Sequence, residues 1–272
     1  MDVDAALIER ARSGEREALD QLVRATKDLV YNLSIRMLGS PSDADDATQE
    51  ILIRIVTHLG SFRGDSAFRT WAYRIASNQL LTTKKRGAEL RIDSFDELGS
   101  RLADNLAAGD PPVDDQLVVR EAKLICTSTM LACLDRDHRL AYILGEIFEL
   151  AGDEAAAILE IAPDAYRKRL SRARERMTEF MGKTCGLVNA DNACRCAKQA
   201  GHAVSAGHLD PNRLAFGAIA CRVERKPERV GDLDAVARAI EVFRSSSELV
   251  APDSLVARVQ RALNTGSSDL LR

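Results

Sequence analysis

The chain of 272 residues is long enough for two small domains and an appendage, and its 46% hydrophobic content is ordinary for a globular protein. Aromatic residues make up only 4% of it, Pro and Gly are few, and Ala, Leu, Arg and Glu are abundant, which predicts an all-α fold. No apolar run approaches the roughly 20 residues that span a bilayer, and the start MDVDAALIER is acidic where a secretory signal is basic. These features predict a cytoplasmic protein without a membrane segment. In that compartment the six cysteines are expected to be buried, metal-bound or redox-sensing thiols and not a disulfide framework.

The formal net charge of −3 conceals two basic islands. Residues 62–86 carry six basic side chains against Asp65, and residues 164–183 carry seven against three acidic ones. Between them, residues 87–115 carry eight acidic side chains and two arginines. Local fields therefore matter more than the net charge, and both islands remain candidates for nucleic-acid binding.

Apolar residues at helical spacing predict the first helices of the chain. One covers residues 2–24 around a break at Ser13-Gly14, and a second periodic run follows Thr26 and ends at Leu38. Gly39 is expected to cap that helix at its C-terminus.

The next helix is predicted to begin in a capping box at residues 42–45. Its acidic residues have two explanations that the sequence leaves open. They can stabilise the positive N-terminus of the helix, or they can form an exposed carboxylate stripe, Asp43, Asp46 and Glu50, for a basic protein partner.

A loop over residues 60–66 follows, and Asp65 or Ser66 is expected to cap the helix after it. In this loop, Phe62 is the candidate for contact with a base, because stacking an unpaired base on an aromatic ring stabilises it by about 1–3 kcal/mol. Trp71 falls on the apolar face of the following helix and is predicted to be half-buried in the core.

Residues 87–115 have no sustained period, contain Pro111-Pro112 and are predicted to be an acidic linker. A second helical domain is expected from Gln116. Within its apolar pattern, Cys126 and Cys133 are most simply small core residues.

A short helix over 153–160, a tight turn and a basic helix over 165–181 form a predicted helix-turn-helix, in which the second helix enters the major groove. The alternative is a solvated amphipathic helix without a ligand. Arginine density favours DNA, because Arg can bond bidentately to guanine and to phosphate. The basic side chains predicted to point outward are Lys168, Arg169, Arg172 and Arg176.

With these residues in place, the chain resembles a bacterial RNA polymerase sigma factor of the extracytoplasmic-function (ECF) type over roughly residues 4–181. The stretch DADDATQEILIRIVTHLGSFRGDSAFRTWAYRIASN is similar to the acidic helix of that family and the signature that follows it. The stretch YRKRLSRARERM is similar to the end of the family's second DNA-binding domain. The two patterns occur in the order and at the separation that the family shows.

The resemblance implies three groups of contact residues. Those matching the helix that docks on the polymerase clamp are Asp43, Asp45, Asp46, Gln49 and Glu50. Those matching the part that captures the melted non-template strand of the minus-ten element are Phe62, Arg63, Gly64, Asp65, Ser66, Arg69, Trp71, Arg74 and Asn78. Those matching the helix that binds the minus-thirty-five element as duplex are Pro163, Asp164, Ala165, Arg167, Lys168, Arg169, Arg172 and Arg174.

The resemblance also implies a division into sigma region 2 (1–86), an acidic linker (87–115) that such proteins thread through the RNA channel of the polymerase, and sigma region 4 (116–182). Residues 183–272 are a helical extension outside this pattern. The implied partners are core RNA polymerase and promoter DNA, and an anti-sigma factor is compatible with the resemblance. Catalysis belongs to the polymerase, so no catalytic residue and no enzymatic activity are expected.

The extension opens with three thiols in twelve residues, Cys185, Cys194 and Cys196. They can supply three ligands of a tetrahedral Zn²⁺ site, with the fourth drawn from His202, His208 or Cys221. Redox-active thiols and a purely structural role are the alternatives, since the spacing is not that of paired C-x-x-C motifs.

Beyond the cysteines, apolar spacing predicts two amphipathic helices, at 233–243 and 255–263. They either form a small domain with the cysteine segment or fold back on a DNA-binding domain and restrain it. The sequence is compatible with both arrangements.

Two further hypotheses compete with a sigma factor. One is a helix-turn-helix regulator that binds duplex DNA without polymerase and carries a thiol or metal sensor in its tail. The other is a metal-dependent enzyme built on the cysteine cluster. The loop around Phe62 discriminates against the regulator, because a protein that binds only duplex DNA has no use for an aromatic residue placed to stack on an unpaired base.

Overall fold

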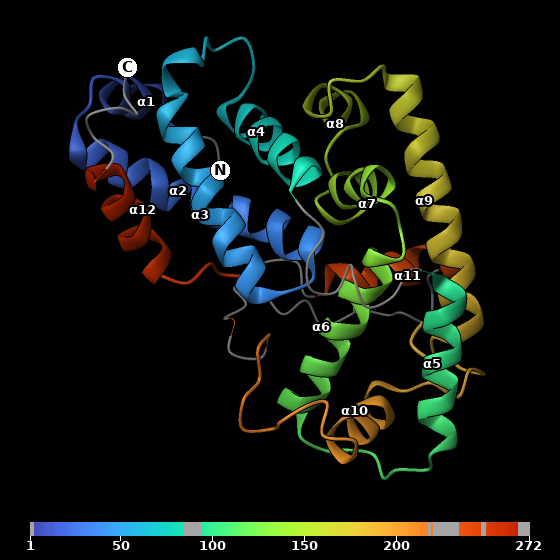
Figure 1. Cartoon of the computed structure of the whole chain (residues 1–272). Helices are drawn as coiled ribbons and strands as arrows, with labels where there is room; N and C mark the ends of the chain where they lie inside the picture. The colour runs from blue at the N-terminus through green and yellow to red at the C-terminus, as the bar shows by residue number, and fades with distance from the viewer. Residues whose placement is uncertain (1–2, 84–93, 217–218, 220–233, 246–248, 266–272) are drawn as a thin grey trace.

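The structure is a computed structural model that describes residues 3–83, 94–216, 219, 234–245 and 249–265. Across this part of the chain the regular elements are helices, and the only β-type pairing is a single bridge between Cys185 and Cys194. The predicted all-α fold is confirmed (Figure 1). Among the described helices, none combines the length and the apolar character that a membrane crossing requires.

The N-terminal domain consists of α1 (Ala5–Arg12), α2 (Arg16–Leu38), α3 (Pro41–Thr57), the 3₁₀ turn η1 (Leu59–Ser61) and α4 (Phe68–Thr82). The predicted break at Ser13-Gly14 is confirmed, because α1 ends at Arg12 and α2 begins at Arg16. Helix α2 is continuous through Thr26, so the second run predicted after Thr26 is not a separate element. Gly39 ends α2 at a φ of 66° and its N–H bonds to the Ile35 carbonyl, which confirms the predicted glycine cap.

The second domain consists of α6 (Gln116–Ala132), α7 (Arg136–Tyr142), the π-helical turn η3 (Ile143–Ile147), α8 (Gly152–Ile158) and α9 (Pro163–Thr184). Helices α7 and α8 both pack against α9. The approach is close at Gly145, where a Cβ atom would lie 2.5 Å from the Tyr166 hydroxyl and 2.9 Å from a Leu170 methyl group. A glycine in the π-helical turn therefore sets the position of the basic helix.

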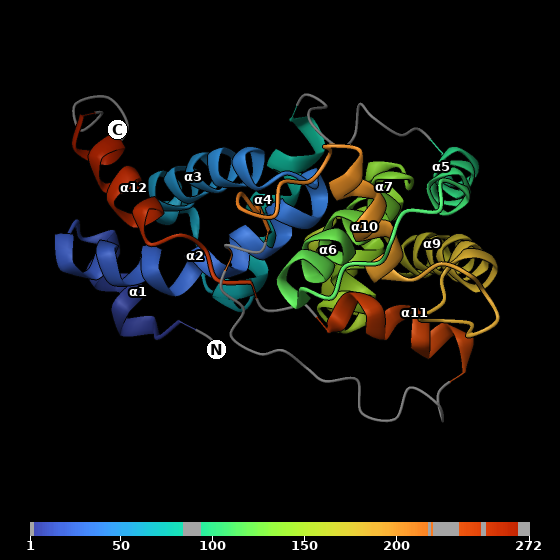
Figure 2. The same ribbon diagram turned by 90° about the horizontal axis from the view of Figure 1, so that it is seen from below.

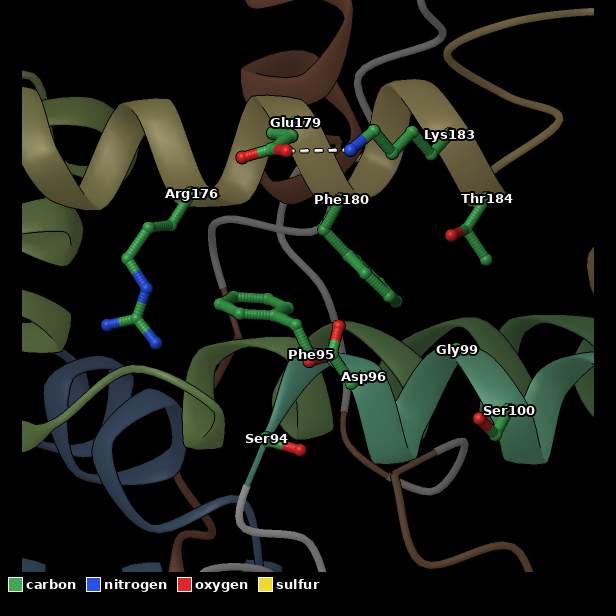
Figure 3. A pocket seen from close by; sticks show the side chains of 10 residues that line it. All are labelled: Ser94, Phe95, Asp96, Gly99, Ser100, Arg176, Glu179, Phe180, Lys183 and Thr184. Carbon is green, nitrogen blue, oxygen red and sulfur yellow. Dashed lines mark hydrogen bonds and ion pairs between the residues drawn. The ribbon is translucent and has the colours of Figure 1, made fainter.

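A helix that the sequence analysis missed lies inside the predicted linker. It is α5 (Phe95–Ala107), and the Ser94 hydroxyl caps it by accepting from the Glu97 amide at 3.1 Å. It packs on the C-terminal half of α9, where Phe95 and Phe180 face each other with ring centroids 5.0 Å apart beside an open groove of about 510 Å³ (Figure 3). Residues 84–93 of the linker, with Lys84, Lys85 and Arg86 of the first basic island, lie outside the described part of the chain.

The extension contains α10 (Cys196–Ser205), α11 (Ala235–Arg244) and α12 (Ser254–Thr265). Of the two predicted arrangements, the structure shows folding back: α10 packs on α5 and α6, α11 on α9 and η3, and α12 on α2 and α3. Figure 2 shows α11 beneath α9 at one end of the molecule and α12 beside α3 at the other. The extension thus contacts both preceding domains.

The main hydrophobic core extends through both domains. At their junction the rings of Tyr73 in α4 and Phe148 after η3 stack at 5.8 Å, and the guanidinium of Arg36 lies 5.5 Å from the Phe148 centroid. Buried Arg139 of α7 donates to the Met37 carbonyl at the end of α2. An arginine at a helix C-terminus stabilises carbonyls that have no partner within that helix.

Candidate polymerase and DNA interfaces

Helix α3 begins two residues earlier than the predicted capping box implies. Ser40 is the N-cap, its hydroxyl accepts from the Asp43 amide at 3.4 Å, and Pro41 occupies the first turn. The predicted box at 42–45 is therefore wrong, because proline at this position already fits the fixed backbone angle of a helix start. Asp45 and Asp46 are not needed as capping residues.

The five predicted polymerase contacts lie along α3, none of them in the core. The side chains of Asp46 and Glu50 are exposed, and the other three are half-buried, namely Asp43, Asp45 and Gln49. Burial raises the pKa of the Asp45 carboxyl, an effect that nearby Arg258 partly opposes. One carboxylate oxygen of Asp45 is buried without a hydrogen-bond partner among the residues that the structure describes.

The aromatic residues of the predicted minus-ten site form a compact cluster. The ring of Phe62 lies 5.6 Å from that of Phe68 and 5.4 Å from that of Trp71. Phe62 and Trp71 are both half-buried, so Trp71 is placed as predicted, while Phe62 is packed into the cluster and does not protrude from the loop. Base stacking by Phe62 remains a prediction that requires the loop to open.

The predicted cap of α4 is absent. The N-cap residue is Ala67, and neither Asp65 nor Ser66 makes a side-chain capping bond. Asp65 is exposed next to exposed Arg63 and Gly64, and the φ of Gly64 is 79°, in the region that favours glycine. The tip of the loop is thus polar and exposed.

The cationic and amide side chains of α4 contact the helix-turn-helix. Arg69 Nη2 donates to Glu154 Oε1 at 3.0 Å, and the Thr70 hydroxyl donates to the same oxygen at 3.0 Å. Arg74 Nε forms an ion pair with the Glu160 carboxylate at 3.9 Å, and Asn78 Nδ2 donates to the other oxygen of that carboxylate at 3.5 Å. Carboxylates therefore occupy the α4 groups that are predicted to face melted DNA.

The helix-turn-helix itself is built as predicted, with α8, a turn and α9, which starts at Pro163. Tyr166, Ala173 and Met177 are buried beneath α9, as the apolar spacing indicates. The predicted minus-thirty-five residues that are exposed on α9 are Pro163, Asp164, Ala165, Arg167, Lys168 and Arg172.

Three arginines of the predicted set pair with carboxylates of this chain, and of these exposed Arg167 pairs with Asp164 within α9. Arg169 Nη1 donates to Asp137 Oδ1 at 2.9 Å. Arg174 Nε donates at 2.9 Å to Glu146, whose side chain is only 7% exposed. Arg176, also predicted to point outward, is exposed but lies over the Phe95 ring, 5.5 Å from its centroid.

The cysteines of the extension meet a fourth thiol that the sequence analysis assigned to the core. Cys126 of α6 lines the same small apolar cavity as Cys185, Cys194 and Cys196. Burial raises the pKa of Cys126 well above its ordinary value and that of Cys196 to about 11. The five described cysteines are free thiols.

Of the predicted fourth metal ligands, His202 is bonded to Asp110 at 2.8 Å, His208 is exposed, and Cys221 lies outside the described residues. Within the described part of the chain, no group of three or more His, Cys, Asp or Glu side chains is arranged to hold a metal ion. Zinc at Cys185, Cys194 and Cys196 therefore remains a prediction.

Comparison with known proteins gives the family. The family model for sigma-70 region 2 matches residues 22–89, which include most of α2 and all of α3 and α4. The ECF RNA polymerase sigma-E factor of Escherichia coli K12 is 32% identical over 180 residues, covering 63% of this chain and 91% of that protein. The chain belongs to the ECF family of RNA polymerase sigma factors.

This sigma factor is also 30% identical to the RNA polymerase sigma-H factor of Pseudomonas aeruginosa over 176 residues, 63% of this chain and 90% of that one. Among solved structures, CnrH in complex with the cytosolic domain of CnrY matches with a TM-score of 0.47 at 25% identity, covering 70% of this chain and 99% of that one. The sigma factor RpoE in complex with the anti-sigma factor NepR from Bartonella quintana matches with a TM-score of 0.37 at 22% identity, covering 63% of this chain and 97% of that one.

The family membership confirms the predicted function as a transcription initiation factor that acts with RNA polymerase. A regulator that works without polymerase is not favoured.

Proposed function

We propose that this sigma factor docks on core RNA polymerase through the acidic side of α3. The observation that carries the proposal is the separation of charge on the described surface. Carboxylates line α3, with Asp46 and Glu50 exposed, while exposed Arg167, Lys168 and Arg172 lie on α9 of the other domain. One acidic and one basic surface suit a protein that holds a protein partner and DNA at once.

The loop at 61–66 and α4 bind the melted non-template strand of the minus-ten element. Phe62 leaves its aromatic cluster and stacks on a base of that strand. The exposed N-terminal half of α9 enters the major groove of the minus-thirty-five element. Within this scheme Arg174 is a structural residue, because its guanidinium is held by nearly buried Glu146.

The proposal includes no chemical step by this chain. The residues that it uses bind and position, and phosphoryl transfer belongs to the polymerase. The protein then works in the cytoplasm, where the polymerase is found, and an anti-sigma factor remains a further proposed partner. In this proposal residues 1–86 act as region 2, residues 87–115 as the linker and residues 116–182 as region 4.

Run-off transcription tests the proposal. It uses purified core polymerase and a DNA template that carries the region upstream of the gene for this protein. We expect the chain to stimulate a specific transcript, and Glu50→Lys to raise the concentration needed for half-maximal stimulation by about tenfold or more, because a like charge would face the basic partner. Glu17→Lys, the same change at an exposed position of α2, serves as the matched control. Loss of stimulation on every template, or equal behaviour of the two variants, contradicts the proposal.

A further inference from the structure

The segment that leads into α12 is held by polar side chains of α2. The Leu249 amide donates to Asn32 Oδ1 at 3.0 Å, and the Ala251 amide donates to Asp28 Oδ1 at 2.9 Å. Lys27, whose side chain is 8% exposed, donates from Nζ to the Ala251 carbonyl at 2.8 Å. Burying an ammonium or amide group costs free energy unless the group is hydrogen-bonded. The polar side chains of α2 and the backbone of residues 249–251 therefore satisfy each other where the segment packs on α2.

Helix α12 then buries one apolar face against the N-terminal domain. Leu255 and Val259 are 0% exposed and Val256 is 1% exposed. Leu255 belongs to the same hydrophobic cluster as Tyr31 of α2 and Ala44 of α3. The docking therefore combines backbone hydrogen bonds with the burial of three aliphatic side chains.

From this docked helix a single arginine reaches the acidic side of α3. Arg258 Nε donates to Gln49 Oε1 at 2.6 Å, and its Nη2 donates to Asp46 Oδ1 at 3.0 Å. Its Nη1 lies 3.9 Å from a carboxylate oxygen of Asp45. Figure 2 shows α12 running beside α3. One guanidinium thus occupies three of the five residues proposed to contact polymerase.

We propose that α12 is an internal cover of the polymerase-binding face, which core polymerase must displace in order to dock. The inference rests on the proposed function of α3. It also defines the chemistry of the partner surface, because a polymerase element that replaces α12 has to supply a basic side chain to Asp46 beside an apolar face.

The cover lowers the apparent affinity for polymerase in proportion to the time that it is closed. When only a fraction of molecules is competent to bind, the apparent dissociation constant equals the intrinsic one divided by that fraction. A substitution in α12 that weakens docking raises the competent fraction without altering α3. The variants in α12 should therefore bind polymerase more tightly than the unaltered chain.

The experiment measures the affinity of the full-length chain for fluorescently labelled core polymerase. For Arg258→Ala, which removes a charge-assisted pair, we expect binding about three- to tenfold tighter than for the unaltered chain. For Leu255→Ala, which acts through packing and not through charge, we expect a shift in the same direction. Arg213→Ala, at an exposed arginine of the extension outside α12, is the charge-matched control and should leave the affinity unchanged.

Amide hydrogen exchange on the unaltered chain provides a second readout that does not depend on the folding of any variant. Amides over 249–265 should exchange faster when core polymerase is bound. Suppose that the unaltered chain binds core polymerase, that both α12 variants bind it with the same affinity as the unaltered chain, and that these amides stay protected. The proposal that α12 covers the polymerase-binding face is then refuted, and the proposed function stands. If neither the unaltered chain nor any variant binds core polymerase, the proposed function fails first.

Discussion

At the scale of single residues, Asp45 shows a conflict between stability and binding. Its carboxylate is half-buried, one oxygen lacks a partner within the described chain, and burial raises its pKa. We expect Asp45→Asn to raise the melting temperature at pH 7, because a neutral amide costs less to bury than a carboxylate. We expect the same change to weaken core polymerase binding, because the amide provides no negative charge for a basic partner. Calorimetry and a polymerase titration on the same variant test the two halves. A lower melting temperature at pH 7 would show that the carboxylate is stabilising where it lies.

The thiols give a second prediction, about pH. Burial, and to a smaller degree nearby Cys185, raises the pKa of Cys196 from its ordinary 9.0 to about 11. A raised pKa keeps the thiol neutral at pH 8, and only the thiolate reacts readily. We therefore expect alkylation of Cys196 by iodoacetamide at pH 8 to be about 100-fold slower in the folded chain than in urea.

The dependence of the Cys196 alkylation rate on pH tests the direction of this pKa shift. In urea the rate at Cys196 should level off above pH 9, whereas in the folded chain it should keep rising towards pH 11, with mass spectrometry of the peptide as the measurement. Equal rates in the two states at pH 8 would mean that the thiol is ionised more easily than its surroundings indicate. Such a result would favour the redox-active interpretation of the cluster.

At the scale of elements, α9 carries two arginines with different roles two positions apart. Arg172 is exposed, whereas Arg174 is bonded to Glu146, whose side chain is 7% exposed. We expect Arg172→Ala to weaken promoter binding by about 1–3 kcal/mol and to leave the free energy of unfolding unchanged. Arg174→Ala should lower the free energy of unfolding by about 1–3 kcal/mol, because it leaves a nearly buried carboxylate without its cation.

Each variant is the control for the other. Holoenzyme binding to promoter duplex and urea unfolding, measured on both, separate the two roles. The assignment is wrong if Arg174→Ala unfolds like the unaltered chain, or if Arg172→Ala binds promoter duplex with unchanged affinity and salt dependence.

Some helices could be predicted from the sequence and others could not. The helix-turn-helix follows from local sequence, because a short helix and a tight turn precede a helix whose apolar residues recur at helical spacing and whose basic residues lie on the opposite face. Helix α5 was missed because an acidic, proline-containing segment hides a buried stripe of only Leu98 and Leu102. A local signal was present, since Ser94 and Glu97 have the spacing of a capping box.

Long-range partners are a different matter. No local pattern relates Arg258 to Asp46, or Glu154 to Arg69, because these pairs are made by the folding of distant segments onto one another. The sequence predicts candidate surfaces of the site, but it does not predict the groups of this chain that contact them. The same limit applies to Cys126, whose apolar neighbours in α6 predict a core residue, and whose proximity to the other thiols appears only in three dimensions.

At the scale of the whole molecule, the two domains are joined through the groups that DNA is proposed to contact. Arg69 and Thr70 both donate to Glu154, and Arg74 donates to the Ala157 carbonyl at 3.2 Å. With the proposed contacts, a melted strand would compete with α8 for these α4 groups. We therefore expect the described arrangement to open when the polymerase and the promoter are bound.

Reversing one charge at this junction should open it in the free protein. We expect Glu154→Arg, which places like charges opposite each other, to raise the radius of gyration in small-angle scattering above the roughly 19 Å of a compact chain of this length. It should also reduce the protection of α8 amides against exchange.

Glu175→Arg, the same change at an exposed site of α9, should alter neither quantity. Circular dichroism checks that the variant keeps its helices, and the milder Glu154→Gln serves if it does not. A compact Glu154→Arg with protected α8 amides would show that apolar packing, as between Tyr73 and Phe148, holds the domains closed without the help of the carboxylates.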